Sequence, residues 1–377
     1  MSLVVDEHRQ FLADEARVGV FEAALRALVA PGDVVLDLAS GTGILGLLAC
    51  RAGAARVYAI ESESIAGLAQ RIARDNGLAD RITMIRDLSS RVTLPEPVDL
   101  IVTDLAGRFG FEAGLFEVLG DARRRLLKPG GRLIPSSITL WLAPVEGTEV
   151  RRQVDFWSRP IAGFSFAAAY AIARGTGYPR LIAPADLLGE PVPLATADLT
   201  TDTDTLAGRA EFVVTRAGSF DGVGGWFSAT LAPGVELTNA PGAPHRINRR
   251  NVFFPLPDAV AVRAGDAVSI AMMVRPEVLM VRWQVEVRRN GSVLYAGGSS
   301  TFEGMLLSQH DLARTRPSSR PALTDAGRAR RLVLELCDGD RPLAEIESAV
   351  FAAHPGLFGD PSDAAAFVAE VVTRYAV

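Results

Sequence analysis

The chain has 377 residues, of which 49% are hydrophobic and 22% are charged, and its formal net charge is −5 at pH 7. This length predicts two or three domains with a sizeable core. Nucleic-acid binding is disfavoured because a mildly acidic chain lacks the strongly basic surface that such partners require. The N-terminal residues lack the pattern of a secretory signal and no apolar run is long enough to cross a membrane, so we expect a cytoplasmic protein without a membrane partner. Two cysteines and four histidines without close spacing predict no metal site.

The first third of the chain alternates predicted helices with short apolar strands. A helix is expected over residues 7–29, ended by Pro31-Gly32-Asp33. Further elements are expected at 34–37, 44–52, 57–61, 64–76, 82–85, 100–102, 112–127 and 132–134. This alternation predicts a parallel sheet with helices on both faces. Residues 1–135 are therefore expected to form a Rossmann-like α/β domain.

The pattern changes after Pro135 to short strands separated by Gly, Pro and Asp. Strands are expected at 139–142, 210–215, 226–231, 252–254, 268–274 and 281–287. They predict an antiparallel β domain, a sandwich or barrel, over residues 136–315. An apolar, Ala-rich segment at 166–188 is expected to be an inserted helical arm.

The last part of the chain predicts a small helical domain over residues 316–377. Thr315 to Pro321 has the composition of a linker. Three short helices are expected beyond it, at 324–336, 342–353 and 361–375. Thr324 and Ser362 are suitable N-cap residues, and Pro342 suits a first helical position.

The strongest functional motif is the run Asp37-Leu38-Ala39-Ser40-Gly41-Thr42-Gly43, between the first predicted strand and its helix. Glycines there let the backbone turn tightly and approach a ligand, and the helix N-terminus offers free N–H groups. The turn is more compact than the Gly-x-Gly-x-x-Gly of dinucleotide-binding proteins. It is closer to an S-adenosylmethionine turn, with a purely structural turn in another α/β protein as the alternative.

Glu61 ends the second predicted strand. A carboxylate at that position can accept hydrogen bonds from both ribose hydroxyls of an adenosine. Each such charged hydrogen bond contributes about 1.5–3 kcal/mol. The acid together with the glycine turn predicts a cradle for an adenosine-containing cofactor.

Several motifs together resemble the protein arginine methyltransferase (PRMT) family of S-adenosylmethionine-dependent enzymes. They are Val34 to Leu45, Ala52-Gly53-Ala54, Val57 to Glu61, Asn76-Gly77-Leu78, Leu126 to Gly131, Ile134-Pro135, and upstream His8, Phe11, Leu12, Asp14, Glu15 and Arg17. The resemblance covers roughly residues 8–300 and implies a Rossmann-like domain followed by a β-barrel. It also implies a homodimer, because the segment at about 164–188 lies where the family has its dimerisation arm.

The resemblance implies a set of cofactor contacts, with Arg17 on the methionine carboxylate, Gly41 under the cofactor and Glu61 on the ribose. The full set is His8, Phe11, Arg17, Asp37, Gly41, Gly43, Ile44, Leu45, Glu61, Ser62, Asp87 and Leu88. His245 falls where the family has a histidine that pairs with an aspartate of the N-terminal helix, here Asp14. An ordinary loop position for His245, and surface positions for Arg17 and His8, are the alternatives.

The acceptor loop departs from the family, which uses two glutamates to hold a guanidinium. Asp104 replaces the first and Glu112 matches the second, while Arg108 stands where the family has an aromatic residue. We expect Asp104 and Glu112 to be catalytic, orienting an acceptor nitrogen and taking its proton, with His245 and Asp14 shaping the pocket. Glu112 as a simple helix N-terminal acid is the alternative. A primary or secondary amine fits these residues at least as well as arginine.

The C-terminal segment is similar to PqqD-like domains, which bind leader peptides of ribosomally made peptide natural products. The similar residues are Leu332 to Gly339, Arg341 to Ile346 and Phe367-Val368. Together the two resemblances favour an N-methyltransferase acting on a peptide amine, as in daptide-type pathways, with a precursor peptide as partner and S-adenosylhomocysteine as product. A protein arginine N-methyltransferase is the alternative, followed by a small-molecule methyltransferase and an inactive S-adenosylmethionine-binding scaffold.

Overall fold

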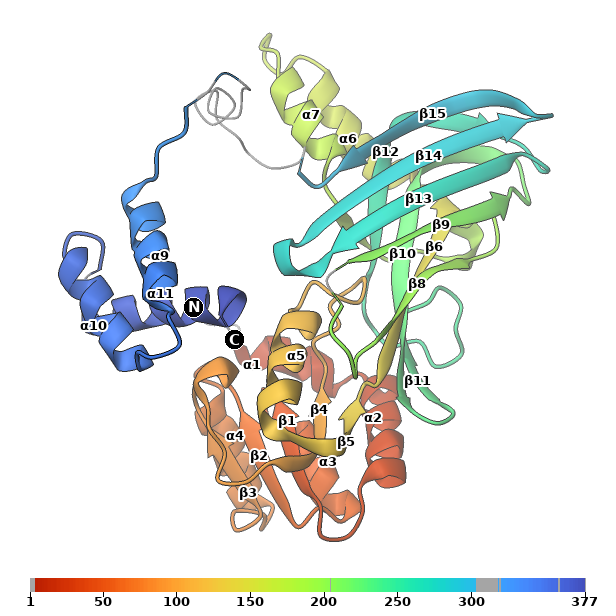
Figure 1. Ribbon diagram of the computed structural model, residues 1–377. Coiled ribbons are helices and arrows are strands. Elements are labelled where there is room, and N and C mark those ends of the chain that lie inside the picture. Colours follow the sequence, from red (N-terminus) through yellow and green to blue (C-terminus); the bar gives the residue numbers. More distant parts are fainter. Residues whose placement is uncertain (1–3, 204, 303–317, 319, 359, 377) are drawn as a thin grey trace. The chain divides into compact units, whose positions relative to one another are not determined.

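The structure is a computed structural model that describes residues 4–203, 205–302, 318, 320–358 and 360–376. The chain divides into two compact units, residues 1–305 and 306–377. The first unit contains a parallel sheet and two antiparallel sheets (Figure 1). None of the helices among the described residues is both long and apolar enough to cross a membrane.

The parallel sheet has the strand order β3-β2-β1-β4-β5. Its strands are β1 (Val34–Leu38), β2 (Arg56–Ile60), β3 (Ile82–Ile85), β4 (Val98–Thr103) and β5 (Leu127–Ile134). The helices α3 (Ile44–Ala52), α4 (Ala66–Asp75) and α5 (Leu115–Leu126) connect them. Every residue of β1 is buried, as expected for a central strand covered on both faces. The expected Rossmann-like α/β fold is confirmed.

The prediction of a single helix over residues 7–29 is wrong, because two helices occupy this segment. They are α1 (Val4–Leu12) and α2 (Glu15–Leu28). Asp14 lies between them in a non-helical conformation, and its side chain accepts a hydrogen bond from the backbone N–H of Arg17. This N-cap starts a new helix where the apolar pattern alone indicated continuity.

The second half of the first unit contains two antiparallel sheets, as expected. One sheet has the order β7-β12-β10-β6-β8, with β11 paired to β10, and the other has the order β15-β14-β13-β9. The strands are β6 (Ser137–Val145), β7 (Tyr178–Arg180), β8 (Val192–Asp198), β9 (Leu206–Val213), β10 (Gly218–Ala232), β11 (Val235–Thr238), β12 (Asn251–Val262), β13 (Ala267–Arg275), β14 (Met280–Arg289) and β15 (Ser292–Ser300).

The expected helical arm at 166–188 is only partly helical. Helix α7 (Ala167–Arg174) ends at Gly175, and strand β7 and the short 3-10 helix η3 (Pro184–Asp186) follow. A further helix, α6 (Thr148–Asp155), precedes the arm and was not expected. Pro179 and Pro184 oppose a continuous helix in this segment because proline lacks the N–H that an inner turn requires.

One hydrophobic core runs through both parts of the first unit. It includes Phe21 of α2, Leu36 of β1, Phe227 of β10 and Trp283 of β14, all fully buried. Helix α2 packs on α3 of the Rossmann-like part and also contacts β10 and β11, so α2 bridges the two parts of this unit. The two parts therefore share one core within this unit.

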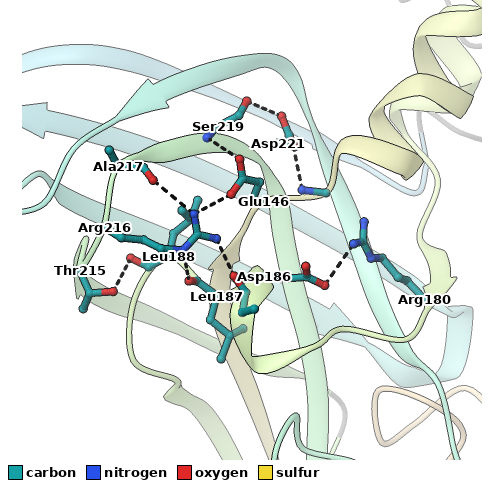
Figure 2. Close-up of polar contacts among 12 residues, drawn as sticks. Glu146, Arg180, Asp186, Leu187, Leu188, Thr215, Arg216, Ala217, Ser219 and Asp221 are labelled. Carbon is teal, nitrogen blue, oxygen red and sulfur yellow. Dashed lines mark hydrogen bonds and ion pairs between the residues drawn. The ribbon is translucent and has the colours of Figure 1, made fainter.

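A polar network lies at one end of the larger antiparallel sheet, where β6 ends and β10 begins (Figure 2). Arg216 donates to Glu146 at 2.6 Å and to the backbone carbonyls of Leu187 and Ala185 at 3.2 and 2.7 Å. Asp221 accepts from the backbone N–H of Gly147 at 2.8 Å. These contacts connect the end of β6 to the start of β10.

Among its described residues, the second unit contains three helices, in agreement with the expected segments. They are α9 (Asp325–Leu336), α10 (Leu343–Ala353) and α11 (Pro361–Tyr375). Val333, Val350 and Val368 are fully buried in a separate hydrophobic core. The expected linker residues 315–317 and 319 lie outside the described residues.

The packing of the loop after β4 on the antiparallel sheet can be tested at Gly225. A Cβ at this position would lie 2.7 Å from Cε2 of Phe109, whereas a Cβ at the exposed Gly19 would meet nothing within 4 Å. We expect Gly225→Ala to lower the free energy of unfolding by about 1–3 kcal/mol, because the added methyl overpacks the core. Gly19→Ala in α2 should raise it by roughly 0.5–1 kcal/mol. Urea unfolding measures both, and equal stability of the two variants would contradict the packing.

Candidate functional site

A glycine turn connects the end of β1 to helix α3. Three of its residues have a positive φ, which is +57° at Ala39, +55° at Gly41 and +79° at Gly43. The Asp37 carboxylate accepts a hydrogen bond from the Gly46 N–H at 2.8 Å and so fixes the turn against the first turn of α3. The amide groups of Gly41 and its neighbours thus lie at the carboxyl end of the parallel sheet, where α/β folds bind ligands.

The Glu61 side chain reaches from the end of β2 to this turn. Only 8% of the residue is exposed. One carboxylate oxygen accepts from the Gly41 N–H at 2.8 Å, and the other accepts from the Glu63 N–H at 2.9 Å. The acid and the glycine turn are therefore brought together, with the acid held in one orientation.

Two buried acceptors in this turn have no hydrogen-bond partner among the residues that the structure describes. They are Oδ1 of Asp37 and Oγ of Ser40. Burial raises the pKa of Asp37 to about 7, against the lowering effects of the Gly46 N–H and of Arg17. Buried polar atoms are rarely left unpaired, so a ligand that carries hydrogen-bond donors fits this position.

The N-terminal helices cover the turn. The His8 ring lies so close to Gly41 that a Cβ there would be 2.7 Å from its Cε1 atom. The Arg17 guanidinium lies 5.5 Å from the ring centroids of both Phe11 and Phe21, and 8% of its side chain is exposed. The structure therefore gathers His8, Phe11 and Arg17 above the glycine turn.

The other residues expected to contact the cofactor lie around this cluster, and several of them are more exposed than Glu61 and Arg17. Ile44 and Leu45 begin α3, with Leu45 buried. Ser62, Asp87 and Leu88 are exposed and follow β2 and β3. Because β1, β2 and β3 are adjacent and parallel, these residues lie at the same edge of the sheet as Gly41.

The Asp104 carboxylate follows β4 and is held by two arginines. Arg17 Nε donates to Oδ2 at 2.5 Å. Arg249 donates from Nη1 to Oδ1 at 3.1 Å and from Nη2 to Oδ2 at 2.8 Å. Burial opposes ionisation, but the two guanidinium groups outweigh it and hold the pKa of Asp104 below its usual range. Asp104 is therefore ionised and already paired.

Glu112 caps its own loop. Its carboxylate accepts from the backbone N–H groups of Arg108 at 3.1 Å and Phe109 at 2.9 Å, with a longer contact of 3.4 Å to that of Phe111. Burial raises the pKa of Glu112 even though these N–H groups favour the charged form. The carboxylate is thus engaged by the loop that carries it.

The expected pair between His245 and Asp14 is wrong. The two carboxylate oxygens of Asp14 accept from the backbone N–H groups of Arg17 at 3.1 Å and Asn248 at 2.7 Å. His245 is exposed and makes no side-chain hydrogen bond with another described residue. Asp14 still joins the N-terminal helix to the loop before β12, but it does so through the Asn248 backbone.

Two further residues of this region were not found from the sequence. Arg249 pairs with Asp104, and Asn239 donates to the backbone carbonyls of Arg108 and Arg250 at 2.7 and 3.0 Å. Asn239 is fully buried and also accepts from the Phe227 N–H at 3.0 Å. No local motif marks either residue, because their partners are far away in the sequence.

Comparisons with known proteins show strong similarity to methyltransferases. The family model of ribosomal protein L11 methyltransferase (PrmA) matches residues 22–140. Protein arginine N-methyltransferase 6 of Xenopus tropicalis is 31% identical over 253 residues, covering 63% of this chain and 74% of that protein. Protein arginine N-methyltransferase 1 of Chlamydomonas reinhardtii is 28% identical over 279 residues, covering 71% and 80%.

Solved structures show the same fold. The Trypanosoma brucei PRMT1 enzyme–prozyme heterotetrameric complex with AdoHcy superposes with a TM-score of 0.71 at 21% identity, covering 78% of this chain and 97% of that chain. The structure of Arabidopsis thaliana protein arginine methyltransferase 10 gives a TM-score of 0.68 at 22% identity, covering 78% and 97%.

The raised pKa of Asp37 makes stability depend on pH. The carboxyl has a pKa of 3.8 in the unfolded chain and about 7 in the folded protein. The folded state therefore binds the proton more tightly, and stability falls as pH rises from about 4 to about 7. Asp37→Asn removes this dependence. The melting temperature of the variant minus that of wild type should therefore be more positive at pH 8 than at pH 5.

Thermal melts of the ligand-free protein measure this difference. Asp80→Asn, at an exposed position, is the control. Its melting temperature should differ from that of wild type by the same amount at both pH values. An Asp37→Asn difference that does not change with pH would contradict the burial argument.

Proposed function

The chain belongs to the protein arginine N-methyltransferase family of S-adenosylmethionine-dependent methyltransferases, and on this premise we propose that it methylates a nitrogen of a protein or peptide. The family assignment is carried by the 31% identity over 74% of a curated member's length. The cradle formed by the glycine turn, Glu61 and Arg17 is the structural observation that supports the proposal.

The residues of the cradle fit S-adenosylmethionine chemically. The buried unpaired acceptors on Asp37 and Ser40 match the ammonium and hydroxyl donors of such a ligand. Arg17 would hold the methionine carboxylate, for which a guanidinium is well suited. Glu61 would accept from the ribose hydroxyls, and Gly41, which has no side chain, lets the His8 ring lie directly against the turn.

The bound cofactor supplies a methyl group that is already activated on a sulfonium, so the chain mainly has to position the acceptor. Alignment of the two reacting groups can contribute up to about 7–11 kcal/mol. Asp104, Glu112 and the buried Phe109 form the acceptor loop after β4. We propose that this loop orients the acceptor nitrogen next to the cradle.

Two acceptor classes follow from different observations. The names of the relatives favour arginine in a protein. The separate C-terminal unit, with its own core and exposed Leu334 and Leu343, supports the second candidate, a peptide amine whose precursor is held by a PqqD-like domain in a daptide-type pathway. Of the two, the comparisons favour arginine.

The test is methyl transfer by the full chain from isotopically labelled S-adenosylmethionine to matched peptides. One peptide carries arginine, one carries lysine, and one ends in a primary alkyl amine. We expect label on at least one peptide, and mass spectrometry locates the nitrogen and counts the methyl groups. A chain that binds the cofactor but labels none of the three would contradict methylation of a peptide nitrogen.

Cofactor binding is tested at Glu61. We expect Glu61→Gln to weaken binding of S-adenosylhomocysteine by about tenfold or more, because a charge-assisted hydrogen bond contributes about 1.5–3 kcal/mol. Glu63→Gln is the control, since Glu63 is exposed and contributes only its backbone N–H here. Isothermal titration calorimetry compares the three proteins, and equal affinities would remove Glu61 from the site.

We also propose that the chain forms a homodimer through the arm. Phe156 lies shortly before the arm, and Phe164 and Phe166 lie at its start. Their exposed fractions of 38%, 71% and 39% place three large apolar side chains from one short stretch of sequence at the surface. Phe164→Glu should shift the protein towards the monomer in light scattering. Val293→Glu, at a 50% exposed position of β15, is the control and should not. A wild-type monomer at micromolar concentration would contradict the dimer.

A further inference from the structure

A largely buried arginine already occupies the acceptor end of the site. Arg249 lies in the loop between β11 and β12, and 12% of its side chain is exposed. Besides its two hydrogen bonds to Asp104, its guanidinium donates to the Gly107 carbonyl at 3.2 Å. Its Cζ atom lies 6.0 Å from the centroid of the Phe227 ring. Carboxylate, carbonyl and aromatic ring together surround this one guanidinium.

The same carboxylate joins Arg249 to the cofactor end of the site. Oδ2 of Asp104 accepts from Arg17 at 2.5 Å and from Arg249 at 2.8 Å. Arg17 is the residue that we assign to the methionine carboxylate. Once Arg17 faces that carboxylate, Asp104 remains paired with Arg249, so Asp104 has no unpaired negative charge to offer a cationic acceptor.

The second carboxylate of the loop does not supply that charge either. Glu112 accepts hydrogen bonds from the backbone N–H groups of its own loop, and burial raises its pKa. Gly107 is held against it, because a Cβ there would lie 2.5 Å from a Glu112 carboxylate oxygen. A guanidinium or ammonium group entering this place would lose its hydration without gaining an anion, which is unfavourable.

We propose that Arg249 determines acceptor specificity by filling the cation position beside Asp104, so that this enzyme methylates an uncharged amine and rejects guanidinium and ammonium groups. The inference rests on the proposed function of methylating a nitrogen, and it favours the amine as acceptor over the arginine that the names of the relatives suggest. The acceptor amine gives its proton to water before it binds. Its lone pair then forms the N–C bond as the C–S bond breaks, so the positive charge passes from sulfur to nitrogen and a proton leaves to water.

A cofactor analogue can probe this position without knowledge of the natural acceptor. Sinefungin carries an amine-bearing carbon in place of the methylated sulfur, so it presents an ammonium group where the methyl group would lie. Calorimetry on the full chain gives the ratio of its affinity to that of S-adenosylhomocysteine. We expect wild type to bind sinefungin more weakly at pH 7. The difference should narrow towards about pH 9.5 as the alkyl amine loses its proton, since such amines have a pKa of up to about 10.4.

Three variants separate charge from structure. Arg249→Gln leaves Asp104 free to hold a cation, so the affinity ratio should rise about tenfold or more in favour of sinefungin. Arg249→Lys keeps the positive charge and should retain the wild-type preference. Arg250→Ala is the matched control, because Arg250 is the exposed next residue and its side chain makes no hydrogen bond with another described residue. Binding of S-adenosylhomocysteine should stay within about threefold of wild type in Arg250→Ala, and the ratio of the two affinities corrects for any change in this binding in the Arg249 variants.

The outcomes distinguish the inference from the proposed function. If wild type binds sinefungin more tightly than S-adenosylhomocysteine at pH 7, or if Arg249→Gln leaves the ratio unchanged, Arg249 does not exclude cations. Methylation of the arginine peptide by wild type would overturn the inference in the same way while supporting the methyltransferase. Failure of every protein to bind S-adenosylhomocysteine would overturn both.

Discussion

The Asp104 carboxylate is the point on which the site depends. It follows β4 of the parallel sheet, Arg17 comes from the first turn of α2, and Arg249 comes from the loop before β12. Removing one partner from such a buried group leaves an uncompensated charge and is strongly destabilising. The N-terminal helix, the parallel sheet and the antiparallel sheets therefore have to assemble together before the site exists.

Backbone contacts enforce the same assembly. Asp14 caps α2 and accepts from the Asn248 N–H, while Asn239 connects the antiparallel sheet to the carbonyl of Arg108. These residues are buried, and each uses its side chain to satisfy a backbone group of a distant segment. The acceptor loop is thus held from both sides, which gives a precise position to a segment without regular secondary structure.

The parallel sheet was largely predictable because its signals are local. The bounds of α3 and β3 agree with the predicted segments, since apolar runs and the adjacent glycines set them within a few residues. The glycine turn and Glu61 lie within 25 residues of Asp37, so one short stretch of sequence contains most of the cradle. The strands β7, β8, β11 and β15 were missed because they are short or rich in Gly, Pro, Ser and Ala, and their pairing partners decide their conformation.

The acceptor end could not be predicted in the same way. The chain has 39 lysines and arginines, and nothing near Arg249 indicates that it reaches Asp104, 145 residues away. The resemblance pairs His245 with Asp14 on residue type and position alone, yet Asp14 accepts a hydrogen bond from the backbone of Asn248, whose position depends on the packing of the loop. Residue type alone does not specify which of several nearby groups completes a buried pair.

This contrast bears on how substrate specificity arises in such a fold. The cofactor end relies on backbone shape and nearby acids, so most changes there would destroy binding of the donor. The acceptor end relies on charges brought together from distant segments, and on our proposal a single residue, Arg249, decides whether the loop accepts a cationic or an uncharged acceptor. A shared fold therefore fixes the methyl donor more firmly than the acceptor, and the acceptor has to be argued from the charges of the loop itself.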